Sequence, residues 1–366
     1  MSNSLASRLL KAAGKNEHAT IMSESKVDYK EVVATTPVPI VNLMLSGHLD
    51  GGIVPGMQQL CGPSRHFKTM CALLMAKSYM DKFPDAVLIF GDSEMGAMKA
   101  FEVYGIDTTR VVHLPMTTVE QATVEFAKII DDIQKDDHVF ILLDSLSNLG
   151  STSEVENALA GDLKADVGRR AKACAAFGRT VNSTVLSLKK IPFVLINSAY
   201  DPIGQGPGAE SIPGGGAKIF LSCDAIYQIS RAKSKDNKED TKEVTGYKFT
   251  YKPLKSRFVK EGAKFELYVD FKHGIYKWSG LFDLAKECGI IISPSMGWYS
   301  INLLGYDKEQ KLRKSVIDGD DKFFEQLIKN ETFKEYCFQK FSLESGHMFQ
   351  EETIDPSTGE IIKLID

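Results

Sequence analysis

The chain has 366 residues, of which 43% are hydrophobic and 25% are charged, so it has the composition of a folded globular protein. This length allows one large domain with an appendage, or two domains. The formal net charge of −4 excludes a basic surface overall, so any nucleic-acid site must be a local groove. The six cysteines form no CxxC pair, and the chain shows neither a signal-peptide pattern nor an apolar run that would span a bilayer. We therefore expect no zinc site, no disulfide framework, no membrane partner and a cytoplasmic location.

From residue 36 onward, short apolar segments alternate with stretches of helical periodicity. This alternation is typical of an α/β fold in which a mainly parallel central sheet carries helices on both faces. We expect it to form a core domain over residues 36–280. The predicted strands are MQQLC from 57, AVLIF from 86, VFILLD from 139, FVLIN from 193 and AIYQI from 225.

Both ends of the chain differ from this pattern. Residues 4–13 have the spacing of a short amphipathic helix, so residues 1–35 are expected to form a separate N-terminal segment. After about Gly280, helical segments surround the short strand GWYSINLL, which predicts a small α+β subdomain at residues 281–366. Residues 231–246 are polar and predict a solvated connection between two strands of a hairpin.

The strongest chemical signal is a near match to the phosphate-binding pattern GxxxxGK[ST]. It follows the predicted strand at 57 and precedes a helical stretch, which is the context that this pattern requires. Backbone N–H groups of such a loop surround phosphates, while Lys68 would reach the β and γ oxygens and Thr69 would bind Mg²⁺. The alternative is a chance match, because Phe67 replaces the second glycine. The loop consists of Gly62, Pro63, Ser64, Arg65, His66, Phe67, Lys68 and Thr69.

Acidic residues close two of the predicted strands. Asp144 ends VFILLD and is the candidate second ligand of Mg²⁺, although an acid in this place is often only a turn residue. Glu94 follows the strand AVLIF and is the candidate base that polarises water, with Asp92 as the second choice. An exposed acid at a strand end is the alternative interpretation of Glu94.

Four segments, GPSRHFKT, FGDSE, ILLDS and VLINS, occur in this order along the chain. Together they resemble the RecA family, most closely its UvsX strand-exchange proteins of phages, which also have Phe in place of the second loop glycine. The resemblance covers residues 4 to about 300. It implies a RecA-like P-loop ATPase core with ATP and Mg²⁺ as cofactors, and an N-terminal oligomerisation arm at residues 1–35.

The resemblance also assigns roles within the nucleotide site. It implies that Lys68 and Thr69 contact phosphate and Mg²⁺, that Glu94 is the general base, and that Asp144 is the acid of the second motif. Phe101 falls where the family places an aromatic residue near adenine, and a core aromatic on a helix is an equal alternative.

In this family ATP lies between neighbouring subunits of a filament. Lys255 and Arg257 match the two cations that reach the γ-phosphate from the adjacent protomer. Side chains at i and i+2 of a strand point the same way, so both can approach one anion. A solvated basic strand edge is the alternative.

The resemblance implies two DNA-facing loops, at residues 157–168 and 199–216. The second loop is rich in Gly and Pro, and Ile203 is its candidate wedge between bases. The helix after the first loop would supply charge for phosphates, unless its basic residues form only a solvated face. The remaining candidate DNA contacts are Arg169, Arg170, Lys172, Gly214 and Gly215.

One position departs from the family pattern. After Asn197 the family has Gln, or His in UvsX proteins, and this residue is thought to sense the γ-phosphate and to order the second loop. Here it is Ser198, whose hydroxyl is shorter. The coupling of ATP to DNA affinity would then be weaker, or would pass through Asn197 or a water molecule.

The resemblance implies a DNA-dependent ATPase that forms helical filaments on single-stranded DNA and pairs it with homologous duplex DNA. Such strand exchange serves recombination, repair and recombination-dependent replication, with single-strand-binding and mediator proteins as further partners. In a phage-encoded protein the location would be the host cytoplasm. Two alternatives stay open, namely a hexameric DnaB-like helicase motor and a recombinase-like accessory protein that does not hydrolyse nucleotide.

Overall fold

The computed structural model describes residues 5–12, 14, 19–24, 31–96, 98–161, 168–181, 183–200, 212–235, 244–346, 352–354 and 361–363. Its centre is a nine-stranded sheet in which six neighbouring strands are parallel and three antiparallel strands continue one edge. In spatial order the strands are β11 (Gly274–Ile275), β10 (Phe265–Asp270), β9 (Val244–Ser256), β8 (Ala225–Lys235), β1 (Gly56–Cys61), β5 (Pro192–Asn197), β4 (Val139–Asp144), β2 (Val87–Asp92) and β3 (Val111–Pro115).

The register brings the carboxyl ends of the parallel strands to one edge of the sheet. Cys61 lies opposite Asn197, and Asp92 lies opposite Asp144. The predicted α/β fold and its mainly parallel sheet are confirmed. The predicted set lacked β3, whose sequence VVHLP is only partly buried and so has a weak apolar signal.

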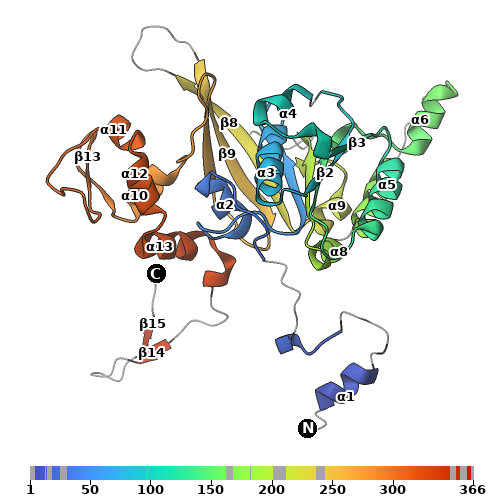
Figure 1. Ribbon diagram of the computed structural model, residues 1–366, viewed down its shortest axis with the longest axis horizontal. Helices are drawn as coiled ribbons and strands as arrows, with labels where there is room; N and C mark the ends of the chain where they lie inside the picture. Colours follow the sequence, from blue (N-terminus) through green and yellow to red (C-terminus); the bar gives the residue numbers. More distant parts are fainter. Residues whose placement is uncertain are drawn as a thin grey trace.

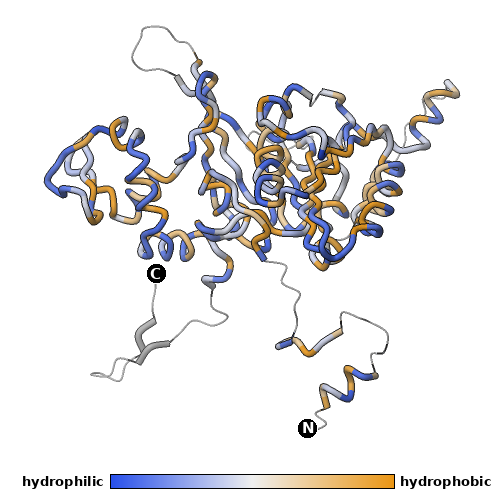
Figure 2. The backbone as a smooth tube through the Cα atoms, viewed as in Figure 1, coloured by the Kyte–Doolittle hydropathy of each residue, from blue (hydrophilic) through white to orange (hydrophobic). Residues whose placement is uncertain are grey.

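Helices cover both faces of the sheet because alternate strand residues enter two separate hydrophobic clusters. Leu142 and Ile196 pack on one side, whereas Leu143 and Leu195 pack on the other. Hydrophobic residues accordingly concentrate along the central strands (Figure 2). The first cluster includes residues of α2 (Pro39–Ser46), α3 (Lys68–Lys82) and α4 (Met98–Tyr104), and the second those of α5 (Val119–Asp132), α7 (Arg169–Thr180), α8 (Ser183–Leu188) and α9 (Ala217–Ser222).

Several short helices and strands connect the main elements of the fold. A capping box between Ser151 and Glu154 starts α6 (Thr152–Leu159), which has no buried residue. The strands β6 (Ala199–Tyr200) and β7 (Ile212–Pro213) pair with each other in an antiparallel manner. The short 3₁₀ helices are η1 (Met22–Glu24), η2 (Thr108–Arg110), η3 (Leu146–Asn148) and η4 (Leu343–Ser345).

The hairpin of β8 and β9 is longer than predicted. The polar segment 231–246 was expected to be a connection, but β8 continues to Lys235 and β9 begins at Val244. Cross-strand pairs such as Arg231 with Phe249 extend the ladder into this segment. The expectation was wrong at both ends because backbone pairing between neighbouring strands outweighs a polar side-chain pattern.

The C-terminal region follows β11 and contains helices and a small antiparallel hairpin. Trp278 stacks on Phe324 at 5.4 Å between ring centroids and donates a hydrogen bond to Asp321 at 2.7 Å. Hydrophobic packing continues across residue 280, so the boundary at 280/281 stays a prediction. Figure 1 shows this region, orange to red, on the opposite side of the sheet from β3 and α5. Its elements are α10 (Leu281–Glu287), β12 (Ile291–Ser295), β13 (Trp298–Ile301), α11 (Lys314–Asp318), α12 (Asp321–Leu327), α13 (Glu331–Phe341), β14 (Glu352–Ile354) and β15 (Ile361–Lys363).

The N-terminal helix α1 (Leu5–Ala12) lies apart from the core (Figure 1) and has no buried residue. Leu5 and Leu9 are 61% and 57% exposed, so this helix leaves an apolar face uncovered in a single chain. Its role as an oligomerisation arm stays a prediction. Within the described ranges, no helix combines the length and the apolar character needed to cross a membrane.

Candidate nucleotide and DNA site

The phosphate-binding loop connects β1 to α3 in a strained backbone conformation. Arg65 and Phe67 have φ angles of 60° and 61°, in the left-handed region that favours glycine. A Cβ atom on Gly62 would come within 2.7 Å of the carbonyl oxygen of Ile229, so only glycine fits there. The loop is thus pressed against β8 and keeps a tight turn despite lacking its second glycine.

The β8–β9 hairpin supports this loop from outside. Phe67 stacks on Phe249 of β9, with ring centroids 5.0 Å apart and planes inclined by 26°. The guanidinium of Arg231 on β8 donates to the carbonyl oxygen of Arg65 at 3.0 Å and lies 4.6 Å from the ring centroid of Tyr247. These contacts explain how Phe67 is held at a positive φ angle. The sequence reasoning did not identify Arg231, Tyr247 or Phe249, because their link to the loop crosses the sheet.

The Lys68 ammonium lies over the loop and donates to the carbonyl oxygens of Gly62 and Pro63 at 2.9 and 2.8 Å. Burial lowers the pKa of Lys68, while the nearby carboxylates of Asp144 and Glu94 oppose that shift. The His66 ring contacts the carbonyl oxygen of Ser64 at 2.9 Å. The Lys68 and His66 side chains thus both fold back onto carbonyl oxygens of the loop. Pro63, Ser64 and Arg65 are exposed, while Gly62 is buried and His66, Phe67, Lys68 and Thr69 are half-buried.

The two candidate Mg²⁺ ligands are in direct contact. The Thr69 hydroxyl, in the first turn of α3, donates to the carboxylate of Asp144 at 2.7 Å. Burial raises the pKa of Asp144 to about 6, with the carboxylates of Glu94 and Asp92 adding to the rise. A hydroxyl and a carboxylate at the carboxyl edge of the sheet are oxygen donors of the kind that Mg²⁺ prefers beside a phosphate.

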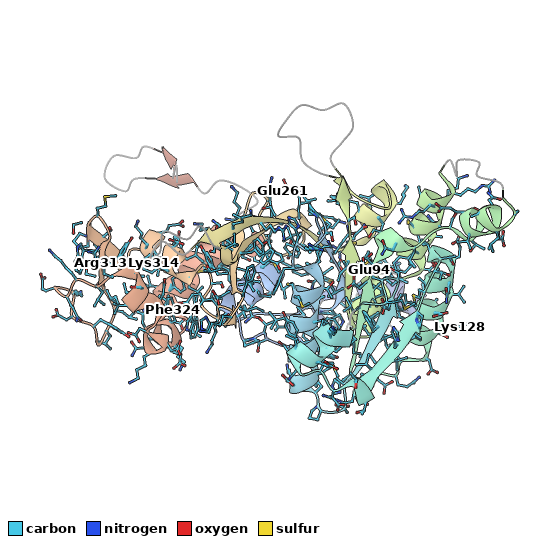
Figure 3. The ribbon with its side chains drawn as sticks, turned by 90° about the horizontal axis from the view of Figure 1, so that it is seen from above. Glu94, Lys128, Glu261, Arg313, Lys314 and Phe324 are labelled. Carbon is cyan, nitrogen blue, oxygen red and sulfur yellow. The ribbon has the colours of Figure 1, made fainter. Side chains whose placement is uncertain are left out.

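Glu94 rather than Asp92 points toward this edge. Its carboxylate accepts a hydrogen bond from the Ser145 hydroxyl at 3.1 Å, next to Asp144 at the end of β4, and Glu94 is exposed. Asp92 is only 4% exposed and accepts the backbone N–H groups of Glu94 and Met95 at 3.0 and 2.7 Å. The geometry therefore favours Glu94 as the base. Figure 3 shows Glu94 in the part of the chain that carries the parallel strands.

The ring of Phe101 is buried and is not exposed at this edge of the sheet. Its side chain is 3% exposed and packs edge-on against Phe90, with centroids 5.1 Å apart. The structure thus corresponds to the alternative interpretation, a core aromatic on helix α4. A stacking contact with adenine is not supported by this packing, because the ring is already covered by the protein.

Lys255 and Arg257 lie at the end of β9 and do not converge on one point within a single chain. The ammonium of Lys255 donates to the carbonyl oxygens of Phe220, Leu221 and Cys223 at 3.2, 2.8 and 2.6 Å, where α9 ends. These are carbonyl groups that a helix end leaves without intrahelical partners. Burial lowers the pKa of Lys255, and Arg257 contributes to the shift in the same direction.

Arg257 is 53% exposed and pairs with the buried carboxylate of Asp224 at 2.9 Å. Within one chain, Lys255 and Arg257 therefore each have a protein partner, whereas the expected shared anion belongs to a neighbouring protomer. Contact with a neighbouring protomer's nucleotide stays a prediction.

The second predicted DNA loop is clamped at its base. The Asn197 side chain, fully buried, donates to the carbonyl oxygen of Gly214 at 2.7 Å and accepts the N–H of Ser198 at 2.9 Å. The N–H of Gly214 donates to the carbonyl oxygen of Ser198 at 2.9 Å, so this N–H group is already bonded within the protein and is not open to a phosphate. Gly215 is half-buried, and Ile203 lies outside the described residues. The link from Asn197 to the loop survives although the family's longer side chain is replaced by Ser198.

The basic residues of α7 divide into two kinds. Arg170 donates to the carbonyl oxygens of Leu149 and Leu146, both at 2.7 Å, and so ties α7 to the segment after β4. Arg169 and Lys172 are exposed, as a phosphate contact requires. Arg170 thus has a structural task that the sequence pattern did not show, because its partners are backbone atoms distant along the chain.

Comparisons with known proteins identify the family of this chain. Residues 278–337 match the family described as the C-terminal domain of the bacteriophage T4 recombination and repair protein. The recombination and repair protein of Enterobacteria phage T4 is 33% identical over 98% of this chain and 90% of its own length. The chain belongs to the RecA-like recombinases of the UvsX type. The RecA proteins of Cutibacterium acnes and Streptomyces rimosus are each 24% identical, over 91% and 82% of this recombinase and 90% and 76% of their own lengths.

The likeness of this recombinase to its family extends beyond the core into the C-terminal region. The T4 relative aligns along 364 residues, so the likeness continues well past residue 300, where the sequence comparison of motifs became weak. The C-terminal family match begins at residue 278 and includes Trp278, the buried ring that joins β11 to α12. The fold of the core, a mainly parallel sheet with a phosphate-binding loop after β1, is that of the RecA-like recombinases.

Proposed function

We propose that this chain is a DNA-dependent ATPase that assembles on single-stranded DNA and pairs it with homologous duplex DNA. The observation that carries the proposal is the meeting of Lys68, Thr69, Glu94 and Asp144 at one edge of the sheet, in a chain of the recombinase family. The helicase alternative is not favoured by that family membership. A recombinase of this kind would act wherever its DNA lies, which for a phage protein is the host cytoplasm.

Each residue of this cluster has a distinct task in the proposed reaction. Lys68 and the loop N–H groups bind the phosphates of ATP, and Thr69 and Asp144 hold Mg²⁺, which supplies charge neutralisation on the phosphates. Glu94 would accept a proton of the attacking water as its oxygen bonds to the γ-phosphorus, the bond from that phosphorus to the β–γ bridging oxygen breaks, and ADP leaves. Ser145 orients the Glu94 carboxylate through its hydrogen bond of 3.1 Å.

DNA binding is assigned to residues that lie beyond the nucleotide site on the same edge. The loop that starts after Ser198 begins at the end of β5, two strands from β2, which delivers Glu94. Exposed cations on α7 would contact the phosphate backbone, and such contacts depend little on sequence. A filament would place Lys255 and Arg257 of one protomer beside the nucleotide of the next.

The test is ATP hydrolysis with and without single-stranded DNA, with negative-stain images of the same sample. We expect DNA to stimulate turnover and the images to show helical filaments. The Lys68→Ala variant should lose nucleotide binding and ATP-dependent DNA binding. Closed rings would move the assignment to a helicase motor, absent turnover in the parent protein would indicate an accessory protein, and unchanged turnover in Lys68→Ala would refute the site.

A further inference from the structure

The turn that carries Glu94 is held by a side chain that the proposed reaction does not use. Chain residues 93–96 leave β2 through a sharp turn in which Met95 has a φ angle of 55°. One carboxylate oxygen of Asp92, the last residue of β2, accepts the N–H groups of Glu94 and Met95 at 3.0 and 2.7 Å. An acceptor that collects two successive backbone donors fixes the direction in which the turn leaves the strand.

The other oxygen of Asp92 is held by the neighbouring strand. It contacts the Nε2 atom of His113 on β3 at 3.0 Å, and the His113 ring stacks on Phe90 with centroids 5.7 Å apart. The side chain of Asp92 is 5% exposed and that of His113 is 43% exposed. Both oxygens of a buried carboxylate are therefore committed, which leaves Asp92 with one orientation.

A second set of contacts ties the same turn to β4. The Ser93 hydroxyl accepts the N–H of Ser145 and donates to its carbonyl oxygen, both at 2.9 Å. The Ser145 hydroxyl then reaches Glu94. Glu94 is thus positioned from β4 on one side and from β3, through His113 and Asp92, on the other.

We infer that Asp92 and His113 are positioning residues for the Glu94 turn, and we call this pair the 92–113 latch. The inference rests on the proposed function, because it concerns the base of that reaction. The hydrogen bonds of Asp92 go to the Glu94 turn and to His113, so the latch positions Glu94, although the Asp92 charge also acts on Asp144. The latch also forms one wall of a cavity of about 240 Å³ lined by Phe90, Asp92, Phe101, Thr108, Val111 and His113.

A positioning role predicts a loss in kcat without a loss in ATP binding. In Asp92→Ala two N–H donors lose their acceptor, so the Glu94 carboxylate drifts and kcat should fall by about 10- to 100-fold. In His113→Ala only the outer support is lost, and a fall of about tenfold is expected. The KM for ATP and the fluorescence titration with a labelled ATP analogue should stay within about twofold of the parent in both.

The conservative variant Asp92→Asn separates positioning from charge. Its amide oxygen can still accept the N–H groups of Glu94 and Met95, and its NH₂ group can donate to His113 in the other tautomer. It should recover most of the kcat that Asp92→Ala loses. A purely electrostatic role of Asp92 would instead make the Asn and Ala variants equally slow, and that result would overturn the inference.

The chain offers a matched control at the opposite edge of the sheet. His138, before β4, pairs with Asp85 at 2.9 Å and stacks on Phe83 with centroids 3.9 Å apart. This pair has the same residue types as the latch, but Asp85 is 66% exposed and the pair does not support the Glu94 turn. His138→Ala should keep the parent kcat. An equal fall in His138→Ala and His113→Ala would show a general stability effect and sink the latch.

The parent protein and Glu94→Gln are measured in the same series. If the parent lacks DNA-stimulated hydrolysis, or if Glu94→Gln retains it, the proposed function itself fails. If Glu94→Gln is inactive but His113→Ala and Asp92→Ala turn over within about twofold of the parent, only the latch fails. Thermal unfolding of each variant confirms that the fold is intact.

Discussion

Phe67 lies in the left-handed backbone region at the place where this loop pattern has a glycine. For a bulky residue that conformation costs about 1–3 kcal/mol, so other contacts must offset it. Stacking on Phe249 does so, and Arg231 stabilises the adjoining carbonyl of Arg65 from the same hairpin. A substitution in the loop therefore changes two opposed contributions to the free energy of unfolding.

Comparing Phe67→Gly with Phe67→Ala separates these contributions. Both lose the stacked ring, but only the alanine variant keeps the left-handed strain, so it should be less stable than the glycine variant by about 1 kcal/mol. Urea denaturation measures the difference. Lys128 is exposed on helix α5 (Figure 3) and serves as the control position. There the glycine variant should be less stable than the alanine variant, because glycine weakens a helix interior by about 1 kcal/mol. Equal stability of the two Phe67 variants would contradict a strain held by stacking.

Helix α7 illustrates how one element serves two purposes. Its Arg170 side chain caps carbonyl groups of the segment after β4, whereas Lys172, two residues on, is exposed. Packing of α7 against α5 and α9 keeps the helix on the sheet, so its exposed residues are presented on a fixed surface. Arg170 is therefore expected to act on the stability of the fold, and Lys172 on the affinity for DNA, although the two cations look equivalent in the sequence.

Substituting glutamine at both positions should reveal this division. Arg170→Gln should lower the free energy of unfolding by about 1–3 kcal/mol, since it leaves carbonyl acceptors without their donor. Lys172→Gln should leave stability unchanged, weaken binding to single-stranded DNA and reduce the slope of log K against log salt by about 0.7. Fluorescence anisotropy at several salt concentrations measures this slope. Lys135→Gln, at the opposite edge of the sheet, is the charge-matched control, and an equal loss of affinity there would argue against α7.

The whole molecule leaves several groups for a neighbouring protomer. The apolar face of α1 is uncovered, and Arg257, two residues after Lys255 in the chain, is half-exposed. In a filament of identical contacts each nucleotide site would combine Glu94 of one protomer with Arg257 of the next. A site shared in this way allows complementation: two chains with different defects can together form an intact site, which a site within one chain does not allow.

Mixing Glu94→Gln with Arg257→Ala should therefore recover hydrolysis. In a random equal mixture about a quarter of the interfaces would pair an intact Glu94 with an intact Arg257, so about a quarter of the parent rate is expected. The control mixture is Glu94→Gln with Lys68→Ala, whose defects lie in the same half-site and cannot complement. The assay is DNA-stimulated ATP turnover against the mixing ratio. A mixture no more active than its components would indicate that each protomer holds a complete site.

The sequence alone determined the fold class, the phosphate-binding loop and the acidic strand ends, because these depend on local periodicity and on residue types at short spacing. It predicted Thr69 and Asp144 as joint ligands of Mg²⁺, and the structure brings their side chains into contact at 2.7 Å. Their binding of Mg²⁺ stays a prediction. The family resemblance was confirmed by the likeness to the T4 protein along nearly the whole chain.

Only the tertiary structure decided which side chains from different strands and helices contact one another. The burial of Phe101, the carbonyl contacts of Arg170 and the support of Glu94 by His113 depend on which strand lies beside which. That order, β4–β2–β3, is not written in the spacing of residues along the chain. Side-chain contacts across it come from packing among elements distant in the sequence, where local propensity carries no information.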